Sequence, residues 1–510
     1  MIEPQRGFRQ TMAWLHGWAG LILGWLLFAI AASGTASVFK GEIGNWMRPE
    51  ISRQASQVEA VAAAIAYLQK AAPHSPAWYL TAPDARSFAT IALYQRKDAN
   101  GAGPFRLTAL DPVTGRPDGI RDTLGGEFLY RFHFELQLPY PWGRILASAA
   151  GMLLLTTLIS GIITHRRIFA DFFTLRPGKG KRSWLDAHNA LGVFAMPFHL
   201  MIAFTGVLTL ITLTLPWAGL ARYGTDSTKL YADLTPGYVA RPASGRPAAA
   251  TADVRTMLND AVRRFGGGHM SLVTVDNPGD AAAVLRIVRN DSDQLADAAA
   301  TATYDMASGR LIAFYAEDRP AKRTYDVLYG LHMGRFMPLF GHWLYFLCGL
   351  TLTATIGTGL VLWSRSRPAG TGAGHRAVAR LTVGTVAAMP LAIAAFFWAN
   401  RLLPIALTDR AEAEVRVFFL VWAAAQIAAL FVRPRLGWIG LLGANAAAWG
   451  LLPILSGLVT GRSLFVSLAH RDWVFASFDL TAFALAACAA LIVRGVVRHR
   501  PAVRTRRRTP

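Results

Sequence analysis

The chain has few cysteines and few charged residues. Its 510 residues include only two cysteines, Cys348 and Cys488, and both fall inside apolar runs. Two thiols exclude an iron–sulfur cluster held by four cysteines and a disulfide framework, so we interpret both as small packing residues. Charged residues make up 16% of the chain and hydrophobic residues 53%, a composition that is too apolar for a soluble protein.

The sequence also lacks several catalytic motifs. Its two long hydrophilic segments, 45–140 and 217–330, contain no Ser-His-Asp arrangement, no zinc-ligand spacing and no phosphate-binding glycine loop. No Gly-x-Gly-x-x-Gly motif follows a predicted strand, so the fingerprint of a bound dinucleotide is missing. Any electrons that the protein uses must therefore come from a quinol or from a partner protein.

Eight long apolar runs predict an all-α polytopic membrane protein. Most runs have at least the roughly 20 residues that an α-helix needs to cross a bilayer. The hydrophilic segments separate run one from run two and run three from run four. Each segment has a helical stretch followed by alternating apolar and polar residues, which predicts a small α+β domain. The runs are 13–38, 142–164, 189–216, 340–363, 381–400, 416–432, 437–459 and 474–495.

The net charge of +21 is concentrated outside the two hydrophilic segments. Those segments together carry a net charge of +1, which leaves +20 for the rest of the chain. If the spans alternate, the excess Lys and Arg fall on one side, which the positive-inside rule assigns to the cytoplasm. We expect both termini in the cytoplasm and both hydrophilic segments in a bacterial periplasm. Because the basic charge follows topology, it does not indicate nucleic-acid binding.

Matched landmarks indicate that one unit is duplicated within the first 366 residues. They recur in the same order at separations of 172, 194 and 199 residues, and such agreement at several positions is hard to obtain by chance. The duplication turns four scattered histidines into two symmetric pairs. The landmarks are His16 with His188, Gly20 with Gly192, LDPVTGR at 110–116 with YDMASGR at 304–310, His133 with His332, and Pro139 with Pro338.

The four matched histidines are candidate metal ligands. His16 and His188, the inner pair, lie near the cytoplasmic ends of their predicted helices; His133 and His332, the outer pair, precede spans on the other side. A histidine at a membrane span is costly to bury without a partner. Two helices at one depth can present imidazoles to opposite faces of a haem iron. The alternative for each histidine is an interface residue bonded to a backbone carbonyl.

Other residues near these pairs have weaker patterns. Arg131, Arg144 and Arg335 lie close to the outer pair in sequence, and their guanidinium groups could neutralise haem propionates. His199 and His342 lie 11 and 10 residues beyond His188 and His332. They could be alternative ligands or a relay between haems. The glycines after His16 and His188 could leave room for a flat macrocycle.

These motifs resemble the PepSY-associated transmembrane family, whose members include iron-regulated inner-membrane proteins. The resemblance rests on WLHGWAGL, LDAHNALG and LHMGRF followed by GLTLTATIGTGLVLWSRSR, and it covers about residues 8–366. The segments with DPVTGR and DMASGR look like the PepSY modules of that family. The family includes ferric-siderophore reductases with two b-type haems. By motif, the resemblance therefore implies that His16, His188, His133 and His332 are the haem-iron ligands.

The resemblance and the apolar runs together predict the domain organisation. We expect a chain whose two periplasmic PepSY-like domains are inserted between transmembrane helices 1 and 2 and helices 3 and 4. The expected parts are transmembrane helix 1 at 1–44, the first domain at 45–140, helices 2 and 3 at 141–216, the second domain at 217–330, helix 4 at 331–366, a cytoplasmic linker at 367–380, a C-terminal four-helix membrane module at 381–496 and a basic cytoplasmic tail at 497–510.

The expected function is reduction of a ferric siderophore in the periplasm, with electrons passed across the inner membrane from a quinol or a donor protein and with release of Fe(II). Two alternatives stay open. One is a haem-free binding or regulatory protein whose PepSY-like domains recognise a peptide or a siderophore. The other is a siderophore permease, which is less favoured because the spans lack charged or helix-breaking residues at mid-membrane. A reducible b-type spectrum would discriminate the first alternative from the oxidoreductase.

The predicted topology can be tested with reporter fusions. A reporter fused after residue 370 is expected to be cytoplasmic, and one inserted near Gly267 is expected to be periplasmic, because the excess positive charge lies on the cytoplasmic side. Alkaline phosphatase activity and green fluorescent protein fluorescence measure the two locations. The reverse pattern would contradict the assignment of sides to both histidine pairs.

Overall fold

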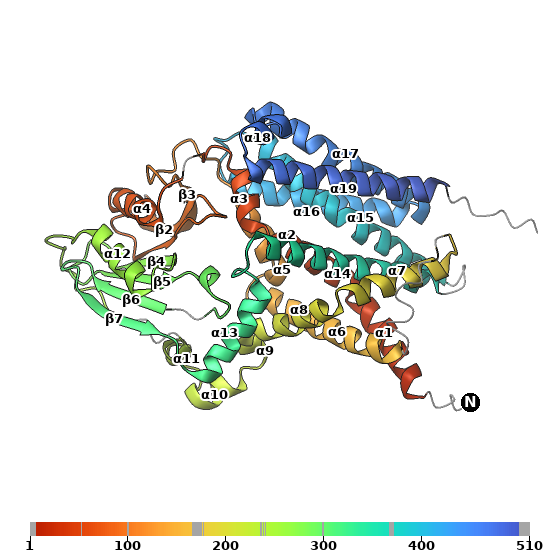
Figure 1. Ribbon diagram of the computed structural model, residues 1–510, viewed down its shortest axis with the longest axis horizontal. Coiled ribbons are helices and arrows are strands. Elements are labelled where there is room, and N and C mark those ends of the chain that lie inside the picture. The colour runs from red at the N-terminus through yellow and green to blue at the C-terminus, as the bar shows by residue number, and fades with distance from the viewer. Residues whose placement is uncertain are drawn as a thin grey trace, which may run out of the picture. The chain divides into compact units, whose positions relative to one another are not determined.

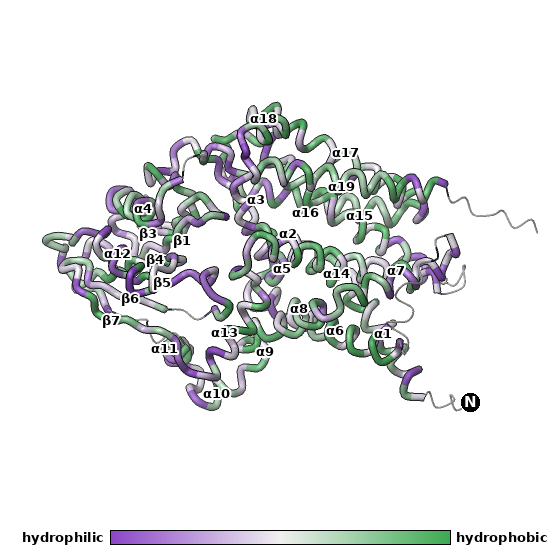
Figure 2. The backbone as a smooth tube through the Cα atoms, viewed as in Figure 1, coloured by the Kyte–Doolittle hydropathy of each residue, from purple (hydrophilic) through white to green (hydrophobic). Residues whose placement is uncertain are grey.

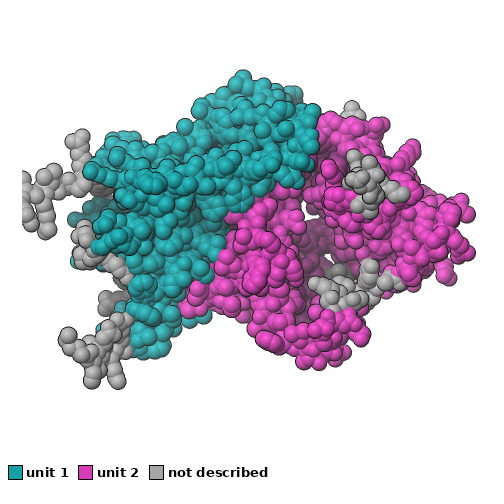
Figure 3. All heavy atoms as spheres, turned by 180° about the vertical axis from the view of Figure 1, so that it is seen from behind, with its two compact units in different colours: residues 1–32, 159–194, 350–510 teal, residues 33–158, 195–349 magenta. Residues whose placement is uncertain are grey.

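The structure, a computed structural model, describes residues 7–498 apart from 53, 99–100, 166–175, 177, 235–236, 238, 240, 298–299 and 367–371. The chain forms two compact units, shown in different colours in Figure 3. Unit 1 comprises residues 1–32, 159–194 and 350–510, and unit 2 comprises residues 33–158 and 195–349. Residues 367–371 of the predicted linker, and residues 499–510 of the predicted basic tail, lie outside the described residues.

Long apolar helices make the chain a multi-pass membrane protein. Within the described residues, six helices are long and apolar enough to cross a membrane, and the number rises to eight if each of two bent helix pairs is one span. Hydrophobic residues run along α6 and α14 (Figure 2). The six helices are α6 (Trp142–Thr164), α14 (Leu339–Arg365), α15 (Gly372–Leu402), α16 (Arg410–Phe431), α17 (Pro434–Thr460) and α19 (Trp473–Arg498).

Two predicted spans are bent instead of straight. The run at 13–38 forms α1 (Phe8–Ile22) and α2 (Gly24–Ser37), with a bend of 68°. The run at 189–216 begins with α7 (Lys181–Phe194) and α8 (Met196–Thr209), which meet at 70°. The breaks at Leu23 and Ala195 are again 172 residues apart. Gly24 follows one break and Pro197 follows the other, and both residue types weaken a helix.

The other helices are shorter. Residues 372–380 of the predicted linker are helical, because α15 begins at Gly372. The short helices are α3 (Lys40–Met47), α4 (Gln57–Ala71), α5 (Gly126–Glu135), α9 (Ile211–Thr214), α10 (Trp217–Tyr223), α11 (Ser227–Leu234), α12 (Val254–Arg264), α13 (Pro320–Met333) and α18 (Leu464–Ala469).

Unit 2 contains one antiparallel sheet of seven strands in the order β3-β2-β1-β4-β5-β6-β7. The two predicted α+β domains therefore do not form separate sheets. Their first strands pair with each other, with Trp78 of β1 opposite Val275 of β4 and Leu80 opposite Val273. The strands are β1 (Ala77–Thr81), β2 (Thr90–Asp98), β3 (Gly101–Leu110), β4 (Met270–Asp276), β5 (Val284–Arg289), β6 (Ala300–Asp305) and β7 (Leu311–Ala316).

Two helices cover one face of this sheet and close a single core. Helix α4 packs on β1 and β2, α12 packs on β5 and β6, and the two helices contact each other (Figure 1). Side chains alternate along the strands, so Trp78 and Leu80 are buried in the core with Leu68 of α4 and Leu258 of α12. The predicted order, a helix followed by strands, is confirmed in both hydrophilic segments.

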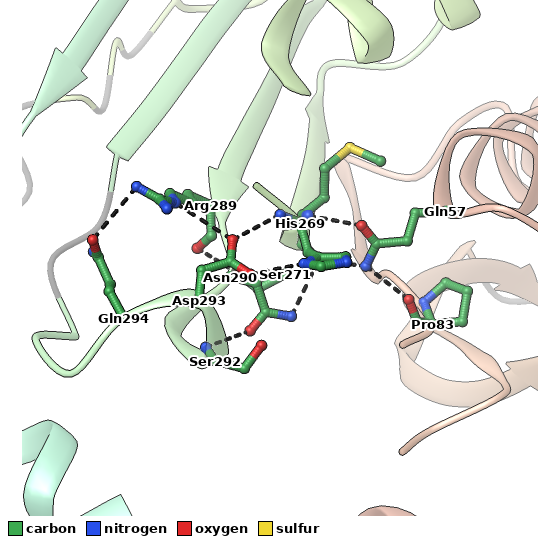
Figure 4. Close-up of polar contacts among 10 residues, drawn as sticks. Gln57, Pro83, His269, Ser271, Arg289, Asn290, Ser292, Asp293 and Gln294 are labelled. Carbon is green, nitrogen blue, oxygen red and sulfur yellow. Dashed lines mark hydrogen bonds and ion pairs between the residues drawn. The ribbon is translucent and has the colours of Figure 1, made fainter. Parts of the chain in front are cut away.

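A glutamine side chain links the two repeats at the edge of this core. The Gln57 Oε1 atom accepts the backbone N–H of Met270 at 2.8 Å, and its Nε2 donates to the carbonyl oxygens of Met270 at 2.9 Å and Pro83 at 2.8 Å. Figure 4 shows these contacts beside the network of His269, Asp293 and Arg289. Helix α4 of the first segment is thus bonded to strand β4 of the second.

The duplicated Asp-x-x-Thr/Ser-Gly-Arg segments form turns of the same geometry. Asp111 Oδ1 accepts the backbone N–H groups of residues 113 and 114, and Asp305 Oδ1 accepts that of residue 308. Gly115 and Gly309 have φ values of +69° and +71°, which glycine adopts without strain. The duplication is therefore also visible in the hydrogen bonds and φ values of individual turns.

Helices α15–α19 of unit 1 form a module with a buried polar network. Arg410 forms an ion pair with Glu414, and Asn400 Nδ2 donates to Glu414 Oε1 at 2.8 Å. Arg401 Nε donates to Ser456 Oγ at 3.1 Å. These side chains are almost fully buried, and charges can be buried only when they are paired and hydrogen-bonded in this way. The network joins the starts and ends of three helices at one end of the module.

Candidate functional site

The inner pair, His16 and His188, is brought together inside unit 1. His16 lies in α1 and His188 in α7, from segments 172 residues apart. The centroids of their imidazole rings are 6.1 Å apart, and the ring planes cross at 70°. The structure therefore pairs the histidines that the duplication matched.

The outer pair, His133 and His332, is brought together in the same way inside unit 2. His133 lies in α5 and His332 in α13, and each helix ends shortly before a candidate span, α6 or α14. The ring centroids are 6.3 Å apart, but the planes are inclined by only 24°. Both pairs thus have nearly the same ring separation and different ring orientations.

This separation matches two ligands of one metal ion. An imidazole nitrogen binds a metal at about 2.0–2.1 Å, so two imidazoles that bind one iron from opposite sides have centroids about 6 Å apart. Ordinary ring contacts in this structure have similar centroid distances, such as 6.1 Å between Phe128 and Phe132, so what sets the two histidine pairs apart is their match to the duplicated landmarks. Among the described residues no three or more His, Cys, Asp or Glu side chains gather as a metal site, so each candidate site offers two protein ligands.

Hydrogen bonds fix one nitrogen of a ring in each pair. His188 Nδ1 lies 2.9 Å from the carbonyl oxygen of Thr355. His332 Nδ1 lies 3.1 Å from Thr205 Oγ1, which itself donates to the carbonyl oxygen of Met201 at 2.7 Å. Both Nδ1 atoms therefore donate, and both Nε2 atoms carry the lone pair. A second-shell acceptor of this kind orients a ligating histidine and raises its basicity.

A glycine on a neighbouring helix faces each of the four rings. A Cβ atom added to Gly161, Gly359, Gly34 or Gly206 would lie 2.5–3.1 Å from the nearest atom of one of these imidazoles. By contrast, a Cβ on Gly192, the glycine that the sequence singled out, would meet Thr355 at an ordinary 3.7 Å. The glycines that make room for the rings are therefore on other helices. Gly34 and Gly206 are 172 residues apart, a signal that the repeat analysis could have used.

His332 is neutral at physiological pH. Burial, with a smaller effect of His133, lowers the pKa of His332 to about 3. His332 is of intermediate exposure as a whole residue. A neutral imidazole is the form that binds a metal.

A polar cluster lies one helical turn before the outer pair. Tyr130 and Tyr329 precede His133 and His332 by three residues, so each tyrosine shares a helix face with its histidine. The two phenol groups share a hydrogen bond, and burial raises the pKa of both. Because α5 and α13 lead into candidate spans, the tyrosines lie on the side away from those spans. This pair was not predicted from the sequence, although its separation is the same 199 residues.

Two cations complete this cluster. Lys40 Nζ lies 3.0 Å from Glu127 Oε2 and 4.2 Å from the centroid of the Tyr130 ring, and burial lowers the pKa of Lys40. Arg335 forms an ion pair with Asp291. Both cations retain about a third of their side-chain surface. Both side chains are therefore only partly covered by the rest of the chain.

The three predicted arginines have different surroundings. Arg335 belongs to the cluster just described. Arg131 and Arg144 both pair with Glu135, at 3.5 and 2.5 Å, and the Arg131 side chain is half exposed. These two arginines therefore share one carboxylate of the chain itself.

The two additional histidines have their own partners. His342 Nε2 accepts from Arg86 Nη1 at 2.5 Å and its Nδ1 lies 3.2 Å from the Pro338 carbonyl oxygen. Arg86 also forms a bidentate pair with Glu42. His199 is fully buried, and its Nε2 lies 3.2 Å from the Cys348 carbonyl oxygen. These contacts favour a structural role for both residues over the predicted alternatives of ligand or relay.

Two comparisons relate the chain to known sequences. A family model described as the PepSY-associated TM region matches residues 13–366. An uncharacterized protein of Pseudomonas aeruginosa is 29% identical over 350 residues, and the alignment covers 64% of this chain and 87% of that protein. The family match includes all four paired histidines and ends before α15 begins.

Proposed function

The chain belongs to the PepSY-associated transmembrane family, and from that premise and the two histidine pairs we propose that it is a haem-containing oxidoreductase of the bacterial inner membrane. In this proposal electrons cross the membrane and reduce a ferric chelate, such as a ferric siderophore, in the periplasm. The proposed cofactors are two b-type haems. One is held by His16 and His188, and the other by His133 and His332.

The ring separation of the two pairs is the observation that carries this proposal. Values of 6.1 and 6.3 Å agree with two imidazoles on opposite sides of one iron. The alternative, histidines that serve only as interface residues, accounts for a hydrogen bond to a carbonyl. It gives no reason for two symmetric pairs with the same spacing.

The residues around the pairs fit a flat macrocycle. Glycines on neighbouring helices leave room for each ring, and the Nδ1 contacts of His188 and His332 leave Nε2 available to a metal. The outer pair has cations and phenol groups nearby that could bind the carboxylates of haem propionates. Lys40 and Arg335 are the candidates, since both keep accessible surface.

The haem iron would supply one-electron chemistry, and the protein residues would control where it takes place. The four histidines would hold the iron ions at two fixed positions, in the neutral form that binds a metal. The charge distribution favours a cytoplasmic location for the inner pair and a periplasmic location for the outer pair. Tyr130, Tyr329, Lys40 and Arg335 would then separate the outer pair from the sheet, where a ferric chelate could approach without entering the membrane.

Each ferric ion takes one electron, so a donor of two electrons serves two ferric ions. Oxidation of one quinol to a quinone releases two protons and two electrons, and these reduce two ferric ions to ferrous ions. Hard oxygen ligands such as hydroxamates hold Fe(II) much less tightly than Fe(III), so reduction releases the metal. The chain itself has no dinucleotide fingerprint, which favours a quinol or a donor protein as the source.

Single histidine substitutions test the pairing. His16→Ala and His188→Ala should each remove the same haem, and His133→Ala and His332→Ala should each remove the other, because one imidazole cannot hold a six-coordinate low-spin iron. Haem content should fall from two to about one per chain. The pyridine haemochrome assay measures the content, and the absorbance spectrum of the reduced protein identifies which haem remains.

His269→Ala is a matched control for these variants. His269 is an exposed histidine that contacts Asp293, so its removal should leave both haems in place. His199→Ala should also retain them, since His199 contacts a backbone carbonyl. A full haem complement in all four pair variants would leave the interface interpretation as the better one.

Reoxidation of the reduced protein tests the enzymatic part of the proposal. Dithionite-reduced protein should be reoxidised anaerobically by ferric hydroxamate siderophores. A ferrous-specific chelator should trap one Fe(II) for each haem that is reoxidised. His133→Ala and His332→Ala should abolish this reaction, while the inner haem stays reducible. The measurement is the decay of the ferrous absorbance with time.

Gallium siderophores provide a control for this experiment, because Ga(III) has the size and charge of Fe(III) but is not reduced under these conditions. They should leave the ferrous spectrum unchanged. If reduced wild-type protein also keeps its spectrum through prolonged incubation with a panel of ferric chelates, the reductase proposal is wrong even if both haems are bound.

A further inference from the structure

Each of the four paired histidines packs against the backbone of a glycine. An added Cβ would lie 2.5 Å from Cε1 of His133 at Gly34 and 2.9 Å from Cε1 of His332 at Gly206. In the inner pair the corresponding distances are 3.1 Å from His16 at Gly161 and 3.0 Å from His188 at Gly359. The glycines lie in α2, α8, α6 and α14, respectively. No histidine of either pair is therefore positioned by its own helix alone.

The arrangement occurs in both repeats. Gly34 and Gly206 are separated by 172 residues, the same distance that separates His16 and His188. Gly161 and Gly359 are separated by 198 residues and each follows a hydroxyl residue, Ser160 or Thr358. In every case the glycine belongs to the same repeat as the histidine that it contacts. A contact between a glycine and a paired histidine of the same repeat thus occurs four times, once for each histidine of the two pairs.

In two of the four contacts, a hydrogen bond holds the ring edge that faces the glycine. His332 Nδ1 is held by Thr205, the residue before Gly206, and His188 Nδ1 is held by Thr355, one turn before Gly359. A ring held at Nδ1 by one residue cannot move away from a new methyl group without losing that bond. Contacts below 3.0 Å require a displacement, whereas contacts of 3.0–3.4 Å require only a few tenths of an ångström. The outer pair is therefore more sensitive than the inner pair.

The two pairs differ in the angle between their rings. The planes cross at 70° in the inner pair and at 24° in the outer pair. In low-spin ferric haem, each imidazole donates π-electron density perpendicular to its ring plane. Parallel rings donate along one direction and split two of the iron d orbitals, whereas crossed rings leave those orbitals close in energy. Through the orientation of the rings, the protein thus controls the splitting of the iron d orbitals.

We propose that Gly34, Gly161, Gly206 and Gly359 are positioning residues that set the ring orientations of the two pairs, and that they make the two haems electronically different. This inference rests on the proposed haem function. The outer pair holds nearly parallel imidazoles, and the inner pair holds crossed imidazoles. The difference comes from the neighbouring helices, since both sites have the same two ligand types.

Electron paramagnetic resonance of the oxidised, detergent-purified protein tests this directly. The wild type should give two low-spin ferric signals, a rhombic signal from the outer haem and a signal with one dominant large-g feature from the inner haem. His133→Ala should remove the rhombic signal, and His16→Ala should remove the large-g signal. Two signals of the same type, or the opposite assignment, would overturn the inference.

Glycine substitutions test which residues set the orientation. Gly34→Ala and Gly206→Ala should shift or abolish the rhombic signal and leave the large-g signal unchanged. Gly161→Ala and Gly359→Ala should shift only the large-g signal, by a smaller amount. Gly192→Ala and Gly151→Ala are matched controls in α7 and α6, because their added Cβ atoms would make ordinary contacts at 3.7 and 3.4 Å. Both controls should keep the wild-type spectrum.

The unchanged signal in each variant shows that the protein is folded. If Gly34→Ala cannot be recovered from membranes, Gly206→Ala tests the same site with a milder contact. Unchanged spectra in all four glycine variants, or equal changes in both signals, would overturn the positioning role. A wild-type protein without haem signals would instead contradict the proposed function, so the two failures are distinguishable.

Discussion

Two imidazole rings about 6 Å apart in a helical membrane protein impose demands on every helix around them. The rings must be neutral if they are to bind a metal. One nitrogen of each ring must have an acceptor, which Thr355 and Thr205 provide for His188 and His332. The facing helices must also approach closely, and a glycine at each contacting turn permits this with least displacement of the ring. The observed threonines and glycines follow from these demands.

The sheet of unit 2 helps to bring the two histidines of the outer pair together. Its central contact joins β1 and β4, the first strands of the two repeats. Helix α5 follows β3 at one edge of the sheet, and α13 follows β7 at the other edge. His133 and His332 therefore come from opposite edges of one sheet. The two repeats associate with each other, and this association both forms the single sheet and brings the two histidines together.

Much of this arrangement could be predicted from the sequence, because it depends on repeated landmarks. The histidine pairing followed from the separations of 172 and 199 residues, and the strand-rich segments followed from alternation. The single sheet could not be predicted, since alternation identifies strands but not their neighbours. The glycines that face the rings lie on helices other than those of the histidines that they contact, so these contacts depend on tertiary packing. Contacts such as Lys40 with Tyr130 depend on tertiary packing and leave no periodic signal.

The most direct test of the account is the haem content of the purified full-length protein. The account predicts a coloured protein with two b-type haems per chain by pyridine haemochrome, and a reduced-minus-oxidised spectrum of low-spin bis-histidine iron. The four histidines and their spacing then have a common explanation. A colourless protein that is folded and does not take up added haem would contradict the central claim and favour a haem-free binding or regulatory role.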